Sequence, residues 1–310
     1  MGRRKRGQDI HGWVLLDKPL GCSSNQALQQ VRRLFQARKA GHTGSLDPLA
    51  TGMLPICFGQ ATKLSGLLLD SNKEYLARAR IGQKTLTGDA EGEVVQTSDP
   101  SGLSLDDFAR IRDQFLGRIL QVPPMYSALK QGGQRLYELA RKGESVERTA
   151  REVVIHSLDL ISYDEGELVV AVRCSKGTYI RTLLEDIAAA VGQVAHLTAL
   201  RRTRVDPFPG GSILSLETLQ DLAGQGMQAL DDKLLPLKSA VPEWPEATLP
   251  DSQLARLASG QAARWPEALP PKLDGDIAIV DGEGSLCAAG RQSAEGQLVS
   301  RKWLSSRIFA

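Results

Sequence analysis

The run from Gly41 to Pro55 limits the conformations of this chain more than any other stretch, because its three glycines and two prolines surround one His and one carboxylate, Asp47. Glycine permits backbone conformations closed to other residues, while Pro48 fixes its own φ and keeps Asp47 out of the helical region. This signature run (residues 41–55) is therefore typical of a shaped loop that presents a reactive group. By composition alone, an ordinary connecting loop with a capping Asp is an equally good interpretation of this run.

The signature run reads Gly-His-Thr-Gly-Ser-Leu-Asp-Pro-Leu-Ala-Thr-Gly-Met-Leu-Pro and is similar to the loop that marks the TruB family of tRNA pseudouridine synthases. Four further stretches resemble the same family, in the same order along the chain: Leu15–Ser24, Gln121–Lys130, Cys174–Thr182 and Ala195–Thr203. The resemblance covers roughly residues 10–205. Chance agreement of five ordered segments is a poor explanation.

Length and composition indicate a globular protein. A chain of 310 residues can form one large domain, or a main domain with a small appendage, and 42% of its residues are apolar. No apolar run approaches the roughly 20 residues needed to span a bilayer. The basic start Arg3–Arg6 is followed by polar residues rather than the apolar core of a secretory signal. We therefore expect a cytoplasmic protein with no membrane partner.

Charge and cysteine content narrow the classes of ligand. The four cysteines lie far apart, which argues against a disulfide framework or structural zinc. The net charge is only +2, yet basic residues gather at Arg3–Arg6, Arg32–Arg33, Arg38–Lys39 and Arg201–Arg204. Such patches fit a nucleic-acid ligand, although each one alone is better explained as solvated surface.

Local patterns predict an α+β fold with a mixed, mainly antiparallel sheet flanked by helices. Strands are predicted at His11–Asp17, Lys73–Gly82, Val153–Tyr163, Leu168–Cys174 and His196–Val205. Helices are predicted after a Ser23 or Ser24 cap and at Thr62–Leu69, Leu105–Leu116, Arg135–Arg141 and Ile180–Val191. In the second of these strands Tyr75, Ala77, Ala79 and Ile81 share one face, and Tyr75 is predicted to begin a sheet edge.

The last quarter of the chain indicates a separate unit. Four prolines between Pro236 and Pro250 predict a linker with a boundary near residue 245. A short helix at Asp251–Ser259 is followed by predicted strands at Ile277–Val280, Leu286–Ala289 and Leu298–Trp303. This pattern resembles the small β-rich PUA-type RNA-binding module of many family members. We predict a basic arm at residues 1–9, a catalytic domain at 10–240 and a PUA-like domain at 246–310.

The resemblance implies isomerisation of the T-loop uridine at position 55 of tRNA to pseudouridine. The C1′–N1 bond breaks, the uracil turns and C5 bonds to C1′, so the chemistry needs an ionised carboxylate, a platform for the base and a proton acceptor. Asp47 is the implied nucleophile. Arg181 is its implied partner, because a nearby guanidinium favours the charged form of a carboxylate in a closed pocket.

The remaining site residues are also implied by the resemblance. Tyr75 would stack on the uracil, an interaction worth about 1–3 kcal/mol per base, with its phenol near the proton transfer. Tyr179 and Leu200 match positions that contact the base. The target base must leave its stack, and His42 is the candidate wedge that fills the gap. By pattern alone, Tyr75 would be a half-buried strand residue, Tyr179 and Leu200 core residues and His42 structural.

Three functions are compared. A catalytically silent RNA-binding or RNA-folding protein would not need Asp47, Tyr75 and Arg181 together, so these residues favour the enzyme. A glycoside hydrolase would need two carboxylates beside the bond, and no second one stands out in the matched motifs, where Thr85–Asp89 is interpreted as a structural loop. We expect tRNA as partner through its T-arm, a monomer, and neither metal ion nor small-molecule cofactor, since no Walker, dinucleotide or metal-ligand motif occurs.

Overall fold

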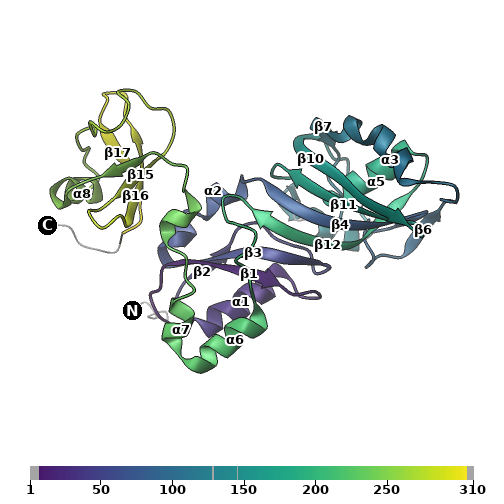
Figure 1. Cartoon of the computed structure of the whole chain (residues 1–310), viewed down its shortest axis with the longest axis horizontal. Helices are drawn as coiled ribbons and strands as arrows, with labels where there is room; N and C mark the ends of the chain where they lie inside the picture. Colours follow the sequence, from purple (N-terminus) through teal and green to yellow (C-terminus); the bar gives the residue numbers. More distant parts are fainter. Residues whose placement is uncertain (1–6, 128, 145, 306–310) are drawn as a thin grey trace.

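The computed structural model of the chain describes residues 7–127, 129–144 and 146–305 (Figure 1). Most of the predicted basic arm, including Arg3–Arg6, lies outside the described residues. In the described part, no helix is long and apolar enough to cross a membrane.

One large sheet organises the first 215 residues. Its strand order is β13-β1-β3-β12-β4-β11-β10-β7, with β2 also paired to β3. Only β1 with β13 and β3 with β12 run parallel, and every other pair is antiparallel. The bounds are β1 Gly12–Lys18, β2 Ala40–His42, β3 Ala50–Phe58, β4 Lys73–Ile81, β7 Gly117–Gln121, β10 Arg151–Asp164, β11 Glu167–Cys174, β12 Ala195–Val205 and β13 Leu214–Ser215. The predicted α+β fold with a mainly antiparallel sheet is confirmed.

Helices cover different parts of this sheet (Figure 1). The first, α1 (Ser24–Leu34), starts at a capping box in which Ser23 and Gln26 bond each other's backbone, and it packs on β1 and β3 together with α6 (Leu216–Gln225) and α7 (Met227–Asp231). At the far end α3 (Leu105–Ile111) and α5 (Ile180–Ala190) pack on β4, β10 and β11. Shorter elements are η1 Gly59–Lys63, α2 Ser65–Leu69, β5 Gln83–Thr85, β6 Val94–Thr97, η2 Arg112–Phe115, β8 Lys130–Gln131, β9 Gln134–Arg135, α4 Leu136–Arg141 and η3 Leu237–Ala240.

The C-terminal residues form a smaller β-rich unit, drawn in yellow-green at one end of the molecule (Figure 1). Its strands follow the order β14-β15-β16-β17 beside α8 (Asp251–Ala258). They span Glu246–Thr248, Ile277–Val280, Leu286–Gln292 and Leu298–Trp303. This unit packs on the large sheet, since Val280 and Leu286 share a buried cluster with Trp13 and Met53. The two units therefore meet through apolar side chains rather than through an extended linker alone.

The structure corrects several element predictions. The buried strand β3 (Ala50–Phe58) begins within the signature run and was not predicted. A strand covered on both faces shows no alternation of polar and apolar residues, so the sequence pattern does not reveal it. The predicted helix at 105–116 is α-helical only to Ile111 and continues as a 3₁₀ turn. Tyr75 does not begin a sheet edge, since β4 lies between β12 and β11. The shared face of Ala77, Ala79 and Ile81 is confirmed by their common cluster with Tyr75.

Candidate active site

The turn that carries Asp47 is held from three sides. This signature loop (residues 43–49) joins β2 to β3, and the Ser24 hydroxyl both donates to the Leu46 carbonyl at 3.0 Å and accepts from the Leu46 N–H at 2.7 Å. The Gly21 N–H donates to the Pro48 carbonyl at 2.9 Å, and the Ala50 N–H donates to the Asp47 carbonyl at 3.0 Å. Leu46 is buried, so the backbone is fixed while the neighbouring carboxylate faces outward.

The turn before the loop is held by a buried lysine. Lys18 is inaccessible to solvent and donates to the carbonyls of Pro19 at 2.9 Å and Cys22 at 2.7 Å. Burial lowers the pKa of Lys18, against the opposing charges of Cys22 and Asp47. Lys18 thus stabilises the segment in which the Gly21 N–H donates to the Pro48 carbonyl.

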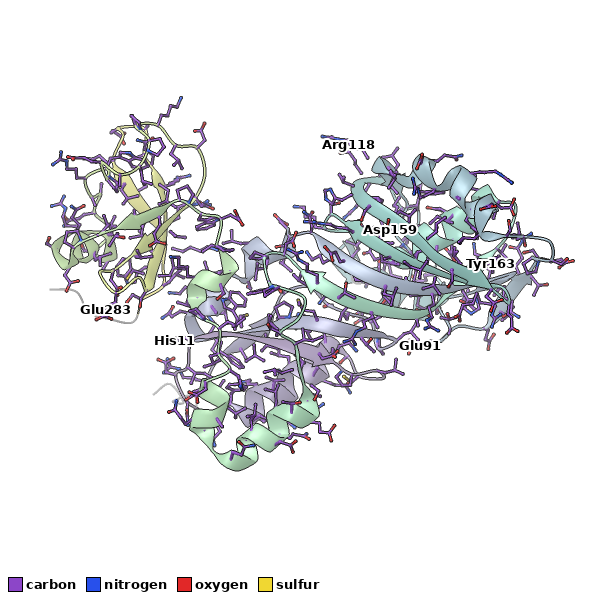
Figure 2. All side chains as sticks on the ribbon, in the orientation of Figure 1. His11, Glu91, Arg118, Asp159, Tyr163 and Glu283 are labelled. Atoms are coloured by element: carbon purple, nitrogen blue, oxygen red, sulfur yellow. The ribbon has the colours of Figure 1, made fainter. Side chains whose placement is uncertain are left out.

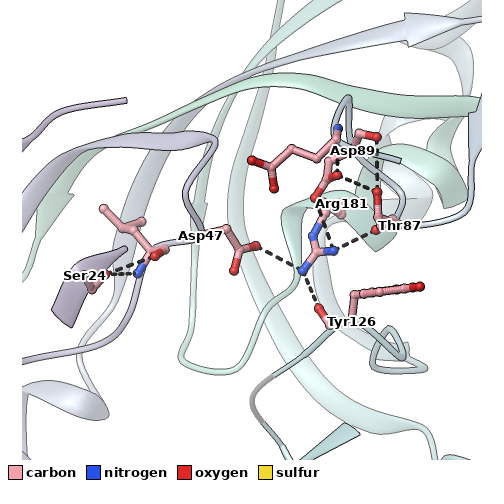
Figure 3. A network of polar contacts seen from close by, with 8 residues as sticks. Ser24, Asp47, Thr87, Asp89, Tyr126 and Arg181 are labelled. Atoms are coloured by element: carbon pink, nitrogen blue, oxygen red, sulfur yellow. Dashed lines mark hydrogen bonds and ion pairs between the residues drawn. The ribbon is translucent and has the colours of Figure 1, made fainter. Parts of the chain in front are cut away.

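Asp47 forms an ion pair with Arg181 at the start of α5. The Asp47 Oδ2 to Arg181 Nη2 distance is 3.0 Å, and the Asp47 side chain remains 55% exposed while that of Arg181 is 7% exposed. Figure 3 shows the guanidinium between Asp47 and two backbone carbonyls, Tyr126 and Thr87, to which it donates at 2.7 Å each. Arg181 is therefore a buried residue with a fixed orientation, and the carboxylate that it holds still faces solvent.

A second carboxylate lies on the other side of Arg181. Asp89 Oδ2 is 3.4 Å from Arg181 Nη1, and Asp89 is almost fully buried (Figure 3). Its Oδ1 accepts the Thr87 hydroxyl at 2.6 Å and the Glu91 N–H at 3.1 Å. The sequence interpretation of Thr85–Asp89 as merely structural missed this contact. A Thr-Gly-Asp turn is a signal for a local carboxylate turn, but nothing in it indicates Arg181, more than ninety residues away.

His42 lies near Asp47 at the end of β2. It is half-buried, and its Nδ1 is buried with no hydrogen-bond partner among the described residues. Burial, and next the charge of Arg202, lower the pKa of His42, so its imidazole is neutral at pH 7. A neutral, partly unpartnered ring can enter an RNA stack with a smaller desolvation cost than a charged one.

Tyr75, Tyr179 and Leu200 lie behind the ion pair. Tyr75 on β4 and Leu200 on β12 pack at the margin of the same core cluster. Tyr179 precedes α5, where the Gln121 side chain bonds both its N–H, at 3.0 Å, and its carbonyl, at 3.2 Å. Burial raises the pKa of both phenols, and the Asp47 charge acts on each in the same direction. The structure thus brings all six predicted residues into one region.

The open part of this region is a cleft of about 810 Å³. Its lining includes His42, Leu46, Asp47, Asp89, Tyr126 and Arg181. Tyr75, Tyr179 and Leu200 are not among its lining residues. Glu91 also lines the cleft, and Figure 2 shows it far from Glu283 of the C-terminal unit. Among the described residues, no group of three or more His, Cys, Asp or Glu side chains could hold a metal ion.

Family models match most of this chain. Residues 32–180 match the TruB family pseudouridylate synthase N-terminal domain, and residues 181–242 match the tRNA pseudouridylate synthase B C-terminal domain. Curated relatives named tRNA pseudouridine synthase B include one from Nitrosococcus oceani, 48% identical over 98% of each chain. Another, from Pseudomonas aeruginosa, is 48% identical over 96% of this chain and 97% of its own.

Solved structures show the same fold. A chain in the crystal structure of a Cbf5-Nop10-Gar1 complex superimposes with a TM-score of 0.74 at 25% identity, covering 96% of this chain and 86% of that one. A chain in the structure of an H/ACA RNP bound to a substrate RNA containing 2′-deoxyuridine gives a TM-score of 0.74 at 22% identity, over 100% of this chain and 93% of that one. The second likeness, at its lower identity, concerns the fold alone.

Proposed function

The chain belongs to the TruB family of pseudouridylate synthases, and from this premise we propose that it isomerises uridine to pseudouridine in tRNA, at T-loop position 55. The names of its full-length relatives support the tRNA substrate. The T-loop position rests on the signature run that this chain shares with the family. The partner is thus tRNA, bound through its T-arm, and we place the reaction in the cytoplasm with a monomeric enzyme.

Asp47 is the proposed nucleophile. It attacks C1′ of the flipped nucleotide or takes a sugar proton, and the C1′–N1 electron pair leaves with the uracil. The uracil turns, and C5 bonds to C1′ as the Asp47–C1′ bond breaks or, on the second route, as Asp47 returns the sugar proton. The C5 proton leaves and N1 gains a proton, so Asp47 is regenerated and no atom is gained or lost overall. The observation that carries this proposal is the Asp47–Arg181 pair, in which one carboxylate oxygen is held at 3.0 Å while the side chain stays 55% exposed to the cleft.

The other residues prepare this step. Arg181 offsets the cost of closing RNA over a charged carboxylate, which would otherwise have to give up its water. His42, neutral and half-buried, is the wedge that replaces the flipped base. Tyr75, Tyr179 and Leu200 provide the platform for the freed uracil as it turns. The Tyr75 phenol takes part in proton transfer. Neither a metal ion nor a small-molecule cofactor is required for this isomerisation.

Two alternatives are less well supported. A silent RNA-binding protein has no use for a carboxylate that faces phosphates. A glycoside hydrolase needs two carboxylates free to act on one bond, and the second carboxylate near Arg181 was not expected from the motifs. Asp89, however, is almost fully buried and is engaged by Thr87, Glu91 and Arg181, so it orients the guanidinium rather than meeting substrate.

The division of labour follows the two units of the fold. We propose a catalytic domain at residues 10–240 and a PUA-like RNA-binding domain at 246–310. All of the described residues that line the cleft with Asp47 belong to the first unit, which supports this assignment. The strand order and the helix α8 of the second unit fit a small β-rich module.

A tritium-release assay tests the function. A T-arm hairpin and a full tRNA transcript, each carrying tritium at uridine C5, are incubated with the protein without added metal or nucleotide. Release of about one tritium per transcript, with pseudouridine at position 55 by sequencing, is the expected result. Release from a transcript whose position 55 is cytidine would contradict the proposed position, and no release from any folded tRNA would refute the activity.

A further inference from the structure

Strand β3 has a gap in its hydrogen bonding beside the signature loop. On one edge it pairs with β1 along Gly52–Phe58, but on the other edge β12 pairs only with residues 50–52 and β2 only with residues 56–58. Between them, the Arg202 Nε donates to the Met53 carbonyl at 2.7 Å and the Thr43 N–H donates to the Pro55 carbonyl at 3.2 Å. A side chain of β12 thus completes the sheet where the strand partner is missing.

The fit of Arg202 into this gap is close. Gly52 faces Arg202 across the parallel pair with φ +97°, and a Cβ at Gly52 would lie 2.3 Å from the Arg202 carbonyl oxygen. From the gap, the Arg202 Nη2 donates to the Gly44 carbonyl at 3.1 Å, three residues before Asp47. The guanidinium therefore fixes the beginning of the signature loop relative to β3.

Arg202 also contacts Tyr75. The two residues are direct partners in the antiparallel pair of β12 and β4, so their side chains leave the sheet on the same face. The charge and side chain of Arg202 act on the Tyr75 phenol, and because a guanidinium can only donate, it is the phenol oxygen that faces it. One side chain links the loop of the proposed nucleophile to the phenol of the proposed base platform.

The hydrogen bonds of the buried Arg202 guanidinium go to backbone carbonyls, not to carboxylates. The side chain is 1% exposed, and within the described ranges no carboxylate lies at ion-pair distance from it. Its charge lowers the pKa of Lys18, His42 and Lys73, so it sits among other titratable groups rather than among anions. Burying an unpaired charge is costly, and an apolar side chain of equal volume would serve packing alone at a lower cost.

We propose that Arg202 is a positioning residue of the reaction, which holds the Tyr75 phenol and the signature loop in register so that proton transfer through Tyr75 depends on it. This inference rests on the proposed pseudouridine synthase function. Burial raises the pKa of Tyr75, whereas the charge and the hydrogen bond of Arg202 oppose that rise. Loss of the guanidinium would therefore release the Tyr75 ring and also raise the pKa of its phenol further.

The test is single-turnover tritium release at saturating enzyme, with tRNA affinity and thermal unfolding measured on the same variants. Arg202→Met should slow the chemical step at least tenfold and leave tRNA affinity within threefold. Arg202→Lys keeps the charge but cannot contact Met53, Gly44 and Tyr75 at the same time. Its single-turnover rate should therefore fall between those of wild type and Arg202→Met. Arg201→Met is the matched control, because Arg201 directly precedes Arg202 on β12, points to the other face of the sheet and pairs with Asp17 at 2.7 Å. The single-turnover rate of Arg201→Met should stay within twofold of wild type.

A double mutant separates positioning from general stability. If Arg202 acts through Tyr75, Tyr75→Phe combined with Arg202→Met should be no more than threefold slower than Tyr75→Phe alone. Independent, multiplicative effects would overturn the proposal, as would a wild-type rate in folded Arg202→Met or Arg202→Lys. If Arg202→Met does not fold, Arg202→Lys decides by the same criteria, alone and with Tyr75→Phe. A wild-type protein that releases no tritium would refute the proposed function itself, which is a different result.

Discussion

Arg181 contacts two carboxylates, Asp89 and Asp47, which differ in their burial and in their other hydrogen bonds. Asp89 is almost fully buried, with one oxygen occupied by Thr87 and Glu91 and the other directed at the guanidinium. Asp47 is 55% exposed and uses one oxygen on Arg181. A buried carboxylate whose acceptor sites are engaged cannot approach a sugar carbon, whereas an exposed one can. The asymmetry supports the roles proposed for them, orientation of the guanidinium for Asp89 and reactivity for Asp47.

Replacement of Asp47 tests this assignment. Asp47→Asn keeps the shape of the side chain but removes the nucleophilic charge, so we expect turnover to fall at least about a thousandfold while tRNA affinity stays within about tenfold, or 1.4 kcal/mol. Asp159→Asn, on the exposed surface of β10 and labelled in Figure 2, is the matched control. Pseudouridine formation near the wild-type rate in Asp47→Asn would remove Asp47 from the nucleophile role.

The sequence predicted part of this site and missed the rest for a physical reason. Asp47 and Arg181 could be found because each lies in a short motif with glycine or proline neighbours. Asp89 and Arg202 could not, because their roles depend on contacts across the sheet and between distant loops. Thr85–Asp89 and the Arg-rich end of β12 look like a turn and a basic surface patch when they are considered locally.

At the scale of elements, β3 was the main omission. Its residues are nearly all buried, so the alternation that identified β4 and β11 is absent. Pro55 also argues against a strand, yet it lies where β3 passes from β12 to β2 and has no strand partner on that edge. Elements with one polar face were predicted well, since periodicity shows only where one side meets water.

The approach of β3 to β12 gives a prediction at Gly52. A Cβ there would lie 2.3 Å from the Arg202 carbonyl oxygen, at a φ of +97° that side chains rarely adopt. Gly52→Ala should therefore lower the free energy of unfolding by about 3 kcal/mol or more, through backbone strain and displaced pairing. Gly192→Ala, also at positive φ but with open space at its Cβ, should cost only about 1 kcal/mol. Equal urea midpoints for the two variants would contradict this reading of the β3–β12 contact.

Lys73 gives a pH-dependent prediction at the end of α2. Its Nζ donates to the carbonyls of Leu69 at 2.9 Å and Ser71 at 2.5 Å, and burial, followed by the charge of Arg202, lowers its pKa to about 8. Between pH 8 and the unfolded value of 10.5, the unfolded chain binds the extra proton, so this group makes stability rise with pH. The rise from pH 8 to 10 should be about 2 kcal/mol for this group alone.

Lys73→Met isolates that contribution. The buried thiol Cys57, whose pKa burial raises to about 11, affects wild type and variant alike and cancels in the difference. Burial also raises the pKa of Cys174 to about 11, and the charge of Lys73 opposes that rise, so its loss in the variant adds to the difference in the same direction. The stability of wild type minus variant should therefore increase between pH 8 and 10 in urea unfolding. A difference that stays flat over this range would show that Lys73 keeps an ordinary pKa in the folded protein.

At the scale of the whole molecule, the C-terminal unit is less independent than a proline-rich linker suggests. Val280, Leu286 and Leu304 pack in one cluster with Trp13 and Met53. Lys63 donates to the Trp303 carbonyl at 2.7 Å, and Lys302 donates to the Lys63 carbonyl at 2.8 Å. Lys302 is thus engaged at the junction, and Arg307 lies outside the described residues. Arg291 and Arg301 are exposed at the edge of a shallow hollow, where Arg301 pairs with Asp276 at 2.6 Å.

Deletion of residues 246–310 should therefore act on stability and affinity together. Removal of the unit uncovers apolar surface near Trp13, so we expect a lower melting temperature as well as weaker tRNA binding. The matched variant is the full-length chain with Arg291→Ala and Arg301→Ala, which should keep the melting temperature within about 2 °C, since exposed substitutions usually cost under 0.5 kcal/mol. Both proteins should show a salt dependence of log affinity that is flatter by about two units, a little under one per lost phosphate contact.

The chemical step distinguishes a binding role from a catalytic one. Within the part of the chain that the structure describes, every residue that lines the cleft with Asp47 lies before the linker. Single-turnover rates at saturating enzyme should therefore match wild type in the double variant and in the folded fraction of the truncated chain. A truncated protein that remains folded and binds tRNA as tightly as wild type, but whose saturated rate collapses, would mean that the C-terminal unit completes the active site. A double variant with an unchanged salt slope would instead place the phosphate contacts on the basic surface of the large sheet.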